Sequence, residues 1–456
     1  MDIEGRQLVS DSVALYLGDA QTVLRRLPSN FVDACVTSPP YWGLRDYGVP
    51  ASVWGGDRSC SHTWGGWQRG RRKDLFPVDR TNVGRIGPNA HQGRAPCMGG
   101  RYCQVCQAWL GCLGLEPTPE QYVANLVGIF REVRRVLKPT GTVWLNLGDS
   151  YASGGGRTRT RRDEHMHRPL IGVDRLAVPT GLKPKDLVGI PWRVAFALQA
   201  DGWYLRSDIV WAKPNPLPES VRDRPSRSHE YLFLLAKTER YFYDSVAIQE
   251  PCQSGPSDIR KMVESLPRIG GKHRGLHDPL AKASAATNIG RHRAVGNPRG
   301  RNRRTVWTVA TAPYRGAHFA TFPAALIEPC IRAGTSERGC CAHCGAPWQR
   351  NTSVSYANPG RRTTNGPRSL ARRHETPGFS VRLEKHVQTL GWRPACACPD
   401  SEPLACTVLD PFAGSGSTLM VATKLGRRVV GIELNGDYES LIRERCSDDV
   451  GIVSAA

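Results

Sequence analysis

Short apolar runs alternate along this chain with stretches in which apolar residues recur at helical spacing. The runs that predict buried strands are residues 13–17, 32–36, 142–147, 203–212, 230–237, 408–409 and 428–432. The stretches with helical spacing are residues 23–27, 118–137, 191–200, 323–331 and 418–425. Strands that alternate with helices predict an α/β fold with a doubly wound, mostly parallel sheet.

Local signals mark both ends of the longest predicted helix. Thr118-Pro119-Glu120-Gln121 has the pattern of a capping box with a proline in the first turn. Lys138-Pro139-Thr140-Gly141 stops the helix, and the next strand begins at Thr142.

The most informative stretch, Val408 to Thr418, lies near the end of the chain. Its sequence is an apolar run, the carboxylate of Asp410, a glycine-rich turn and a helix start. A strand, a tight loop and a helix N-terminus form the place where an α/β sheet binds a nucleotide-like ligand. The stretch is neither a Walker loop nor a GxGxxG fingerprint. An ordinary turn is the alternative, but the next strand also ends in an acid, Glu433, suited to ribose hydroxyls.

A second unusual loop follows the strand at residues 32–36. It reads Thr37-Ser38-Pro39-Pro40-Tyr41. Alone, this sequence would suit a stiff surface turn, since two prolines fix the backbone.

The two loops together resemble the amino-group DNA methyltransferases, which make N4-methylcytosine or N6-methyladenine. Ser-Pro-Pro-Tyr after a strand and Asp-Pro-Phe-x-Gly-Ser-Gly elsewhere are the motifs that carry the resemblance. The catalytic motif precedes the cofactor motif, as in the β-type, circularly permuted order of that family. The resemblance covers both ends and most of the middle of the chain, and it implies a Rossmann-like methyltransferase sheet.

The resemblance also implies the roles of individual residues. Those expected at the methyl donor, S-adenosylmethionine, are Asp19, Phe322, Pro323, Asp410, Phe412, Gly414, Gly416, Ser417 and Glu433. Asp19 would lie near the adenine and Glu433 at the ribose. Ser417 stands where the family often has threonine, and either hydroxyl can cap the helix. Ser38, Pro39, Pro40 and Tyr41 would present the base.

The chemistry of amine methylation suits these residue types. An exocyclic base amine is a poor nucleophile because its lone pair is delocalised into the ring, so acceptors must polarise its N–H bonds. Ser38 Oγ and a carbonyl of the Pro-Pro pair can accept those hydrogens, and Tyr41 offers a face for a base extruded from the duplex. No covalent base adduct is needed, so Cys35 is expected in the core.

The target base and the reaction class are left with alternatives. Serine at the first position of the motif leans towards cytosine N4 in this family, whereas aspartate leans towards adenine N6. The other hypotheses are a zinc-bearing nucleic-acid-binding protein that no longer catalyses, and an RNA or protein methyltransferase. The sequence does not reveal the recognition site, or whether a cognate restriction nuclease accompanies the protein.

Many of the 15 cysteines fall in tight groups inside two insertions. One insertion holds Cys60-x-His62 and Cys103-x-x-Cys106, with Cys97 and Cys112 as spare candidates. The other holds Cys341-x-x-Cys344 and Cys396-x-Cys398, with Cys340 as an alternative. Four N or S donors in such pairs are typical of structural zinc sites, so the sequence predicts one or two zinc ions, with unligated thiols as the alternative.

Charge and composition complete the picture. Lys and Arg exceed Asp and Glu by 62 − 41 = 21, which suits a polyanion such as double-stranded DNA, although solubility or a membrane surface could use the same charge. No run approaches the roughly 18 apolar residues of a membrane span, and no signal pattern opens the chain, so a soluble cytoplasmic protein is expected.

The expected domain order follows from these segments. The predicted parts are a catalytic half at 8–54 and 116–244 with a basic loop at 153–176, a Cys/His insertion at 55–115, a basic candidate target-recognition segment at 245–305, a cofactor half at 306–334 and 407–447, and a Cys-rich insertion at 335–406.

Overall fold

The computed structural model describes residues 6–10, 12–44, 47, 49–66, 100–152, 181–216, 218–250, 301–311, 322–357, 384–399 and 401–447. The chain divides into two compact units. One comprises Met1–Tyr243, Arg304–Pro347 and Cys396–Ala456, and the other comprises Asp244–Arg303 and Trp348–Ala395. The predicted basic loop at 153–176, most of the segment at 245–305 and Cys97 lie outside the described residues.

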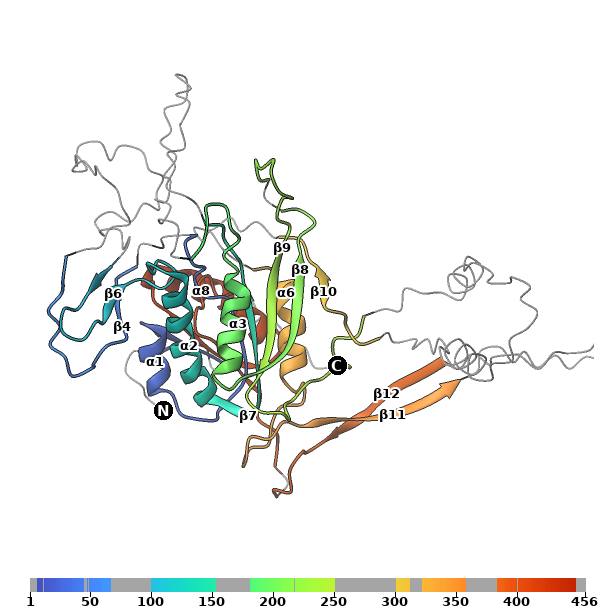
Figure 1. The fold of residues 1–456 in the computed structure, drawn as a ribbon. Coiled ribbons are helices and arrows are strands. Elements are labelled where there is room, and N and C mark those ends of the chain that lie inside the picture. The colour runs from blue at the N-terminus through green and yellow to red at the C-terminus, as the bar shows by residue number, and fades with distance from the viewer. Residues whose placement is uncertain are drawn as a thin grey trace, which may run out of the picture. The chain divides into compact units, whose positions relative to one another are not determined.

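A large mixed sheet forms the centre of the first unit (Figure 1). Among the described residues its nine strands follow, in spatial order, as β1 (Arg6–Ser10), β2 (Val13–Leu17), β14 (Arg428–Glu433), β13 (Thr407–Asp410), β3 (Val32–Thr37), β7 (Leu137–Leu147), β9 (His229–Ala236), β8 (Tyr204–Ala212) and β10 (Val306–Thr308).

The centre of this sheet is parallel, as the sequence predicts. The five neighbours from β2 through β14, β13 and β3 to β7 all pair in parallel. Strand β9 runs antiparallel to both β7 and β8, and β1 is an antiparallel edge strand. The last two strands of the chain, β13 and β14, therefore lie between two of the first, β2 and β3.

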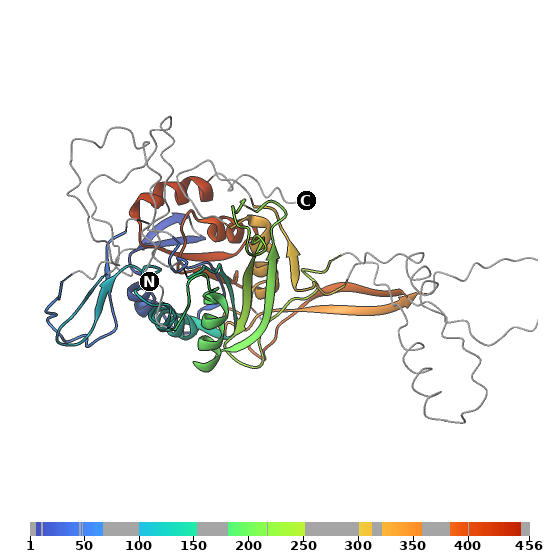
Figure 2. The ribbon, with the colours of Figure 1, turned by 45° about the horizontal axis from the view of Figure 1, so that its top comes forward.

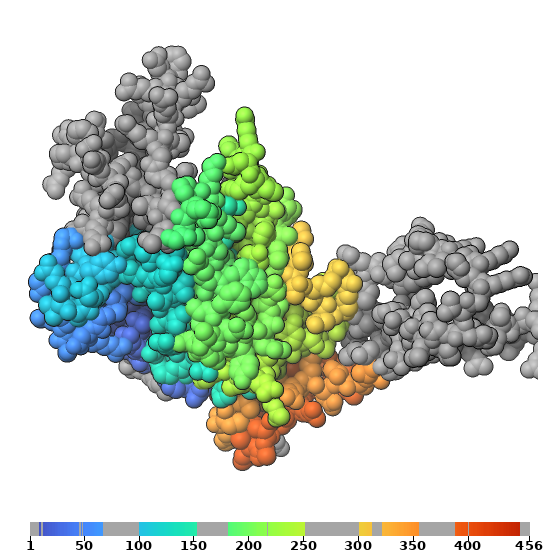
Figure 3. All heavy atoms as spheres, viewed as in Figure 1, coloured from blue at the N-terminus to red at the C-terminus, as the bar shows by residue number. Residues whose placement is uncertain are grey.

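Helices cover both faces of the sheet, which makes the fold doubly wound (Figure 2). Helices α1 (Ala20–Arg26), α2 (Pro119–Val136) and α3 (Ile190–Ala200) contact one another in series. Helix α6 (Ala324–Gly334) contacts α7 (Ser417–Lys424), which contacts α8 (Glu439–Ser447); the short 3-10 helix η2 (Gly436–Tyr438) leads into α8. In the space-filling view the residues of α2 and α3 form one continuous surface (Figure 3).

The start of α2 shows the N-cap half of the predicted capping box. Thr118 is the N-cap, its Oγ1 accepts a hydrogen bond from the Gln121 N–H, and Pro119 is in the first turn. Strand β7 begins at Leu137, five residues before the predicted Thr142. Leu137 already pairs with Val32, and a shift in register before Thr142 accommodates Pro139, which has no N–H to donate.

The core lies between the sheet and the helices. Tyr122, Leu126, Ile129 and Val133 recur at helical spacing on α2 and are completely buried. Every residue of β3 is buried, as expected for a central parallel strand, and Cys35 is a core residue as predicted. Among the described residues, no helix combines the length and apolar composition needed to cross a membrane.

The described residues also form two smaller β elements. Strands β4 (Ser52–Trp54), β6 (Trp109–Gly111) and β5 (Arg101–Tyr102) form an antiparallel sheet in the first unit. In the second unit β11 (Gln349–Ala357) and β12 (Glu384–Arg393) form an antiparallel ribbon.

Candidate active site and cysteine clusters

A cavity of about 990 Å³ lies where the carboxyl ends of the central strands meet. Residues from both ends of the chain line it. The predicted site residues among its lining are Asp19, Ser38, Pro39, Pro40, Tyr41, Phe322, Phe412, Gly414, Ser417 and Glu433. The parallel sheet therefore brings the two loop motifs, far apart in sequence, to one cavity.

Buried hydrogen bonds join the two motifs behind the cavity. Thr37, the last residue of β3, donates from Oγ1 to Asp410 Oδ1 over 2.6 Å. Asp410 Oδ1 also accepts from the Phe412 N–H at 3.1 Å. Thr418 donates from Oγ1 to the carbonyl of Val36 at 3.2 Å. The loop before Ser38 and the glycine-rich loop are thus fixed to each other.

The glycine-rich loop turns through conformations that favour glycine. Gly414 has φ of 52° and Gly416 has φ of 78°, both in the left-handed region. Gly416 is the N-cap of α7. The turn brings the Gly414 N–H to Glu433 Oε2 at 2.7 Å, and the Asn435 N–H lies 2.7 Å from Oε1 of the same carboxylate.

Burial changes the acidity of both acids. It raises the pKa of Asp410 to about 6, against the hydrogen bonds from Thr37 and from the Phe412 N–H, which lower it. It raises the pKa of Glu433 to about 7, against the backbone N–H groups that lower it.

Three of the predicted cofactor residues are not in the cavity lining. Asp410 is buried behind the loop, where it holds Thr37 and Phe412. Gly416 starts α7, and Pro323 is the buried N-cap of α6. Asp19 does line the cavity, and its Oδ1 caps α1 by accepting from the Thr22 N–H at 2.9 Å.

Neighbouring residues hold the Pro-Pro-Tyr loop rigidly. Tyr122 on α2 donates from Oη to the carbonyl of Pro40 at 2.8 Å. Gly148, which follows β7, lies against the ring of Tyr41, so that a Cβ at this glycine would be 2.5 Å from Cε2 of the ring. The part of the Tyr41 ring around Cδ2 and Cε2 therefore lies against backbone.

A family model described as DNA methylase, for the N6 and N4 methyltransferases, matches residues 32–342 and 401–444. This chain belongs to that family. The methylase is 36% identical over 439 residues to the Type II methyltransferase M.XycI of Xanthomonas campestris pv. cyanopsidis, which covers 96% of this chain and 89% of the relative. It is 35% identical over 434 residues to the Type II methyltransferase M.SmaI of Serratia marcescens, covering 95% of this chain and 90% of the relative.

A solved structure is also similar, at a lower level. The PvuII DNA methyltransferase (cytosine-N4-specific) aligns with 98% of this chain and 89% of its own, at 13% identity and a TM-score of 0.43. The family model and the relatives establish that the enzyme is an S-adenosylmethionine-dependent DNA methyltransferase of the amino-group type.

Sequence reasoning missed several polar residues of the methylase cavity. Asn146, Lys213 and Glu230 line it beside Ser38 and Tyr41. Each lies near the end of a sheet strand that the sequence does predict: Asn146 in β7, Lys213 directly after β8, and Glu230 at the start of β9. A polar side chain at either end of a buried strand is the sequence signal that could have indicated these residues.

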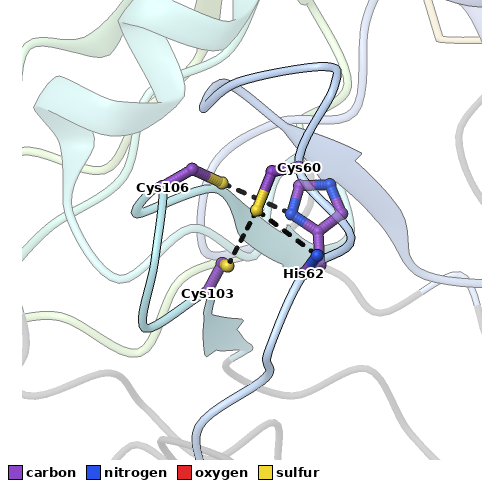
Figure 4. Close-up of side chains that lie close together, drawn as sticks. All are labelled: Cys60, His62, Cys103 and Cys106. Carbon is purple, nitrogen blue, oxygen red and sulfur yellow. Dashed lines mark hydrogen bonds between the residues drawn. The ribbon is translucent and has the colours of Figure 1, made fainter.

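The first cysteine cluster of the methylase lies beside the small sheet of β4, β5 and β6. Figure 4 shows Cys60, His62, Cys103 and Cys106 pointing toward one another from two segments. One ligand atom from each residue lies within 4.8 Å of all the others. The Sγ atoms of Cys60 and Cys103 are 3.8 Å apart, and Cys106 Sγ is 3.3 Å from His62 Nδ1.

The second cluster unites Cys341, Cys344, Cys396 and Cys398 within the same limit of 4.8 Å. Neither described spare cysteine belongs to a predicted set of four. Cys112 donates to the carbonyl of Val49 at 3.4 Å. Cys340 lies with Asp33 and Cys406 in a separate buried group, where Lys138 Nζ is 2.7 Å from Asp33 Oδ1 and 3.4 Å from Cys340 Sγ. The lysine ammonium already supplies a cation there.

Proposed function

We propose that this enzyme transfers the methyl group of S-adenosylmethionine to the exocyclic N4 of a cytosine flipped out of double-stranded DNA. The observation that carries the proposal is the shared cavity, which brings Ser38 and Tyr41 to the glycine-rich loop and Glu433. The choice of cytosine is supported by the serine at position 38, where aspartate would favour adenine in this family.

The cofactor side of the cavity has the donors and acceptors that the methyl donor requires. Glu433 would accept from the ribose hydroxyls, with Asp19 near the adenine and Phe412, Gly414 and Ser417 beside the methionine. The left-handed φ of Gly414 favours glycine in this loop, and glycine has no Cβ. When bound, S-adenosylmethionine supplies an electrophilic sulfonium methyl group.

The base side presents acceptors to an amine. Ser38 Oγ and the carbonyl of Pro39 would accept the two N–H groups, which returns electron density to the amine nitrogen. Pro39 is the better candidate of the two prolines because the carbonyl of Pro40 already accepts from Tyr122. The flipped base would stack on the ring of Tyr41, which Gly148 contacts near Cδ2 and Cε2.

We also propose that the chain is a circular permutation of the usual methyltransferase order. The support is the position of β13 and β14, which come last in sequence and lie in the middle of the sheet. The net charge of +21 supports contact with DNA phosphates, with the segment at 245–305 as the candidate for target recognition.

Each cluster of four N or S ligands is proposed to hold a structural zinc ion. Their convergence within 4.8 Å fits tetrahedral coordination with small adjustments, and the donor types are those that zinc prefers. Zinc would join segments that are far apart in sequence. At the end of the second insertion, the Thr407 N–H donates to Asp33 Oδ2 at 2.8 Å, which fixes the point where the chain returns to the sheet.

Transfer of a tritiated methyl group to duplex DNA of mixed sequence tests the proposal. Mild acid releases purine bases and leaves cytosines on the polymer. Label that stays with the polymer supports cytosine as the target base. Label released with the purines would show that adenine is the target base instead. Ser38→Ala is expected to bind the cofactor normally and to transfer roughly 100-fold more slowly, since it lacks the oriented acceptor.

A further inference from the structure

The hydroxyl of Tyr41 is the meeting point of three side chains in the cavity. Ser38 Oγ lies 3.2 Å from Tyr41 Oη, Asn146 Oδ1 lies 2.8 Å from it, and Glu230 Oε2 also lies 2.8 Å from it. All three are hydrogen bonds; the contacts with Asn146 and Glu230 have the usual length, and the contact with Ser38 is longer.

The donors and acceptors in this group are fixed by their other partners. Asn146 Nδ2 donates to the carbonyl of Tyr231 at 3.1 Å, so its Oδ1, which can only accept, faces Tyr41. Glu230 forms an ion pair with Lys213 through its other oxygen, and a carboxylate, like the amide oxygen, can only accept. Lys213 is held in turn over the ring of Trp211, at 4.3 Å.

The group is therefore one proton short. Three contacts converge on Tyr41 Oη, but only the hydroxyls of Ser38 and Tyr41 carry a hydrogen for them. If Ser38 donates to Tyr41, the single Tyr41 hydrogen serves either Asn146 or Glu230. One more proton, placed on Glu230, would give every contact its own hydrogen: Glu230 to Tyr41, Tyr41 to Asn146, and Ser38 to Tyr41.

Methylation of an amine produces one proton that must leave. The bond between the amine nitrogen and the methyl carbon forms as the sulfur–carbon bond breaks, and that electron pair stays on sulfur. The nitrogen is then cationic until it loses one of its hydrogens, and a base close to the amine is needed to receive it.

We propose that Glu230 is the final acceptor of this proton, reached through Ser38 and Tyr41. The amine gives its proton to Ser38 Oγ, the Ser38 hydrogen passes to Tyr41 Oη, and the Tyr41 hydrogen passes to Glu230 Oε2. The nitrogen becomes neutral, both hydroxyls end with one hydrogen each, and the carboxylate becomes a carboxylic acid. Lys213 and Asn146 are the positioning residues of this relay.

The surroundings of Tyr41 favour a phenol that passes a proton on over a phenolate that holds a negative charge. Burial and the Glu230 carboxylate raise the pKa of the Tyr41 phenol well above its usual value. The phenol therefore stays protonated at rest and passes a proton only when it receives one. The carboxylate of Glu230, part of whose side chain remains exposed, can return the proton to solvent after each turnover.

This inference rests on the proposed transfer to a base amine, but not on which base is methylated. Its test uses the complete enzyme, duplex DNA and saturating S-adenosylmethionine in a single turnover. Glu230→Gln keeps an oxygen that accepts from Tyr41 but cannot take a proton. We expect the affinities for cofactor and DNA to stay within about twofold and the transfer rate to fall by roughly 100-fold.

A matched variant controls for the loss of a carboxylate in an ion pair. Glu132 on α2 accepts from Arg135 at 2.7 Å and does not line the cavity. Glu132→Gln should therefore transfer at the rate of the unaltered enzyme.

Chemical rescue separates proton transfer from a purely structural role. Glu230→Ala opens a space next to Tyr41, and added formate is expected to restore its rate in a saturable way, while Glu230→Gln should not respond. If Glu230→Gln transfers within about threefold of the unaltered rate at saturating DNA, or if formate restores neither variant, the relay is wrong. Absence of transfer by the unaltered enzyme would instead contradict the proposed function.

Discussion

Thr37 donates a hydrogen bond of 2.6 Å to the carboxylate of Asp410, 373 positions later in the chain. Thr37 precedes Ser38, and Asp410 precedes the glycine-rich loop, so this bond joins the loop proposed to hold the base to the loop proposed to hold the cofactor. Because Asp410 is almost completely buried, the bond lies in surroundings where a missing partner is costly.

Removing this hydroxyl should lower both stability and activity. Thr37→Val keeps the shape of the side chain but leaves Asp410 with one donor fewer, which is expected to lower the free energy of unfolding by about 2 kcal/mol. Chemical denaturation measures this difference, and the single-turnover transfer rate is expected to fall with it. Thr37→Ser retains the hydroxyl and is the matched control; a loss in Thr37→Ser without one in Thr37→Val would show that the methyl group matters instead.

A methyl group at Gly148 should displace Tyr41. The added Cβ of Gly148→Ala would lie 2.5 Å from Tyr41 Cε2, closer than side chains tolerate, so the ring must move. We expect the transfer rate to fall by roughly 100-fold, as for small displacements of positioned groups, with cofactor affinity unchanged. Gly66→Ala, which meets nothing within 4 Å, is the control for a glycine replacement. Full activity of Gly148→Ala would contradict the fixed position of Tyr41.

A buried acid should make stability depend on pH. Burial raises the pKa of Glu116 to about 7 from 4.5, although Asn125 and the Gly114 N–H stabilise its charge. The folded enzyme therefore holds this proton more tightly than the unfolded chain. The resulting stability is fully present below pH 4.5 and is lost as the pH rises through about 7.

Glu116→Gln removes this dependence and provides the measurement. Relative to the unaltered enzyme, the variant should gain about 3 kcal/mol of unfolding free energy between pH 4.5 and 8. Denaturation curves at several pH values measure the difference, and comparison of the two proteins cancels other groups that titrate in the range. A constant difference would show that Glu116 does not change ionisation there.

Metal content tests the two cysteine clusters separately. Elemental analysis of the purified enzyme should find two zinc ions per chain, and Cys106→Ser and Cys344→Ser should each lose one. A chelator is expected to lower the unfolding temperature, since zinc binding contributes to folding. Cys112→Ser, outside both clusters, should keep both ions.

Short patterns in the sequence were enough to predict the main elements and the two loops. The strand before Ser38 and the strand that ends at Asp410 are short apolar runs. A glycine-rich sequence after a strand is typical of a tight turn, so the loop could be predicted as well. Cys-x-x-Cys and Cys-x-His pairs likewise bring two ligands together locally. Which pair joins which was predicted from spacing alone, and the sets of four are the ones that converge.

The network around Tyr41 could not be predicted in the same way. Asn146, Lys213 and Glu230 come from three strand ends that meet only because β9 lies between β7 and β8. No local pattern encodes that order. The placement of Asp410 behind the cavity depends on the direction of one side chain, which follows from its bond to Thr37 and not from the motif.

The central claim is that Ser38 and Tyr41 direct a methyl group to cytosine N4 in duplex DNA. The most direct test incubates the enzyme with unmethylated duplex DNA and isotope-labelled S-adenosylmethionine, digests the DNA to nucleosides and identifies the labelled nucleoside by mass. The account predicts labelled N4-methyldeoxycytidine. Labelled N6-methyldeoxyadenosine would contradict the assignment of the base from Ser38.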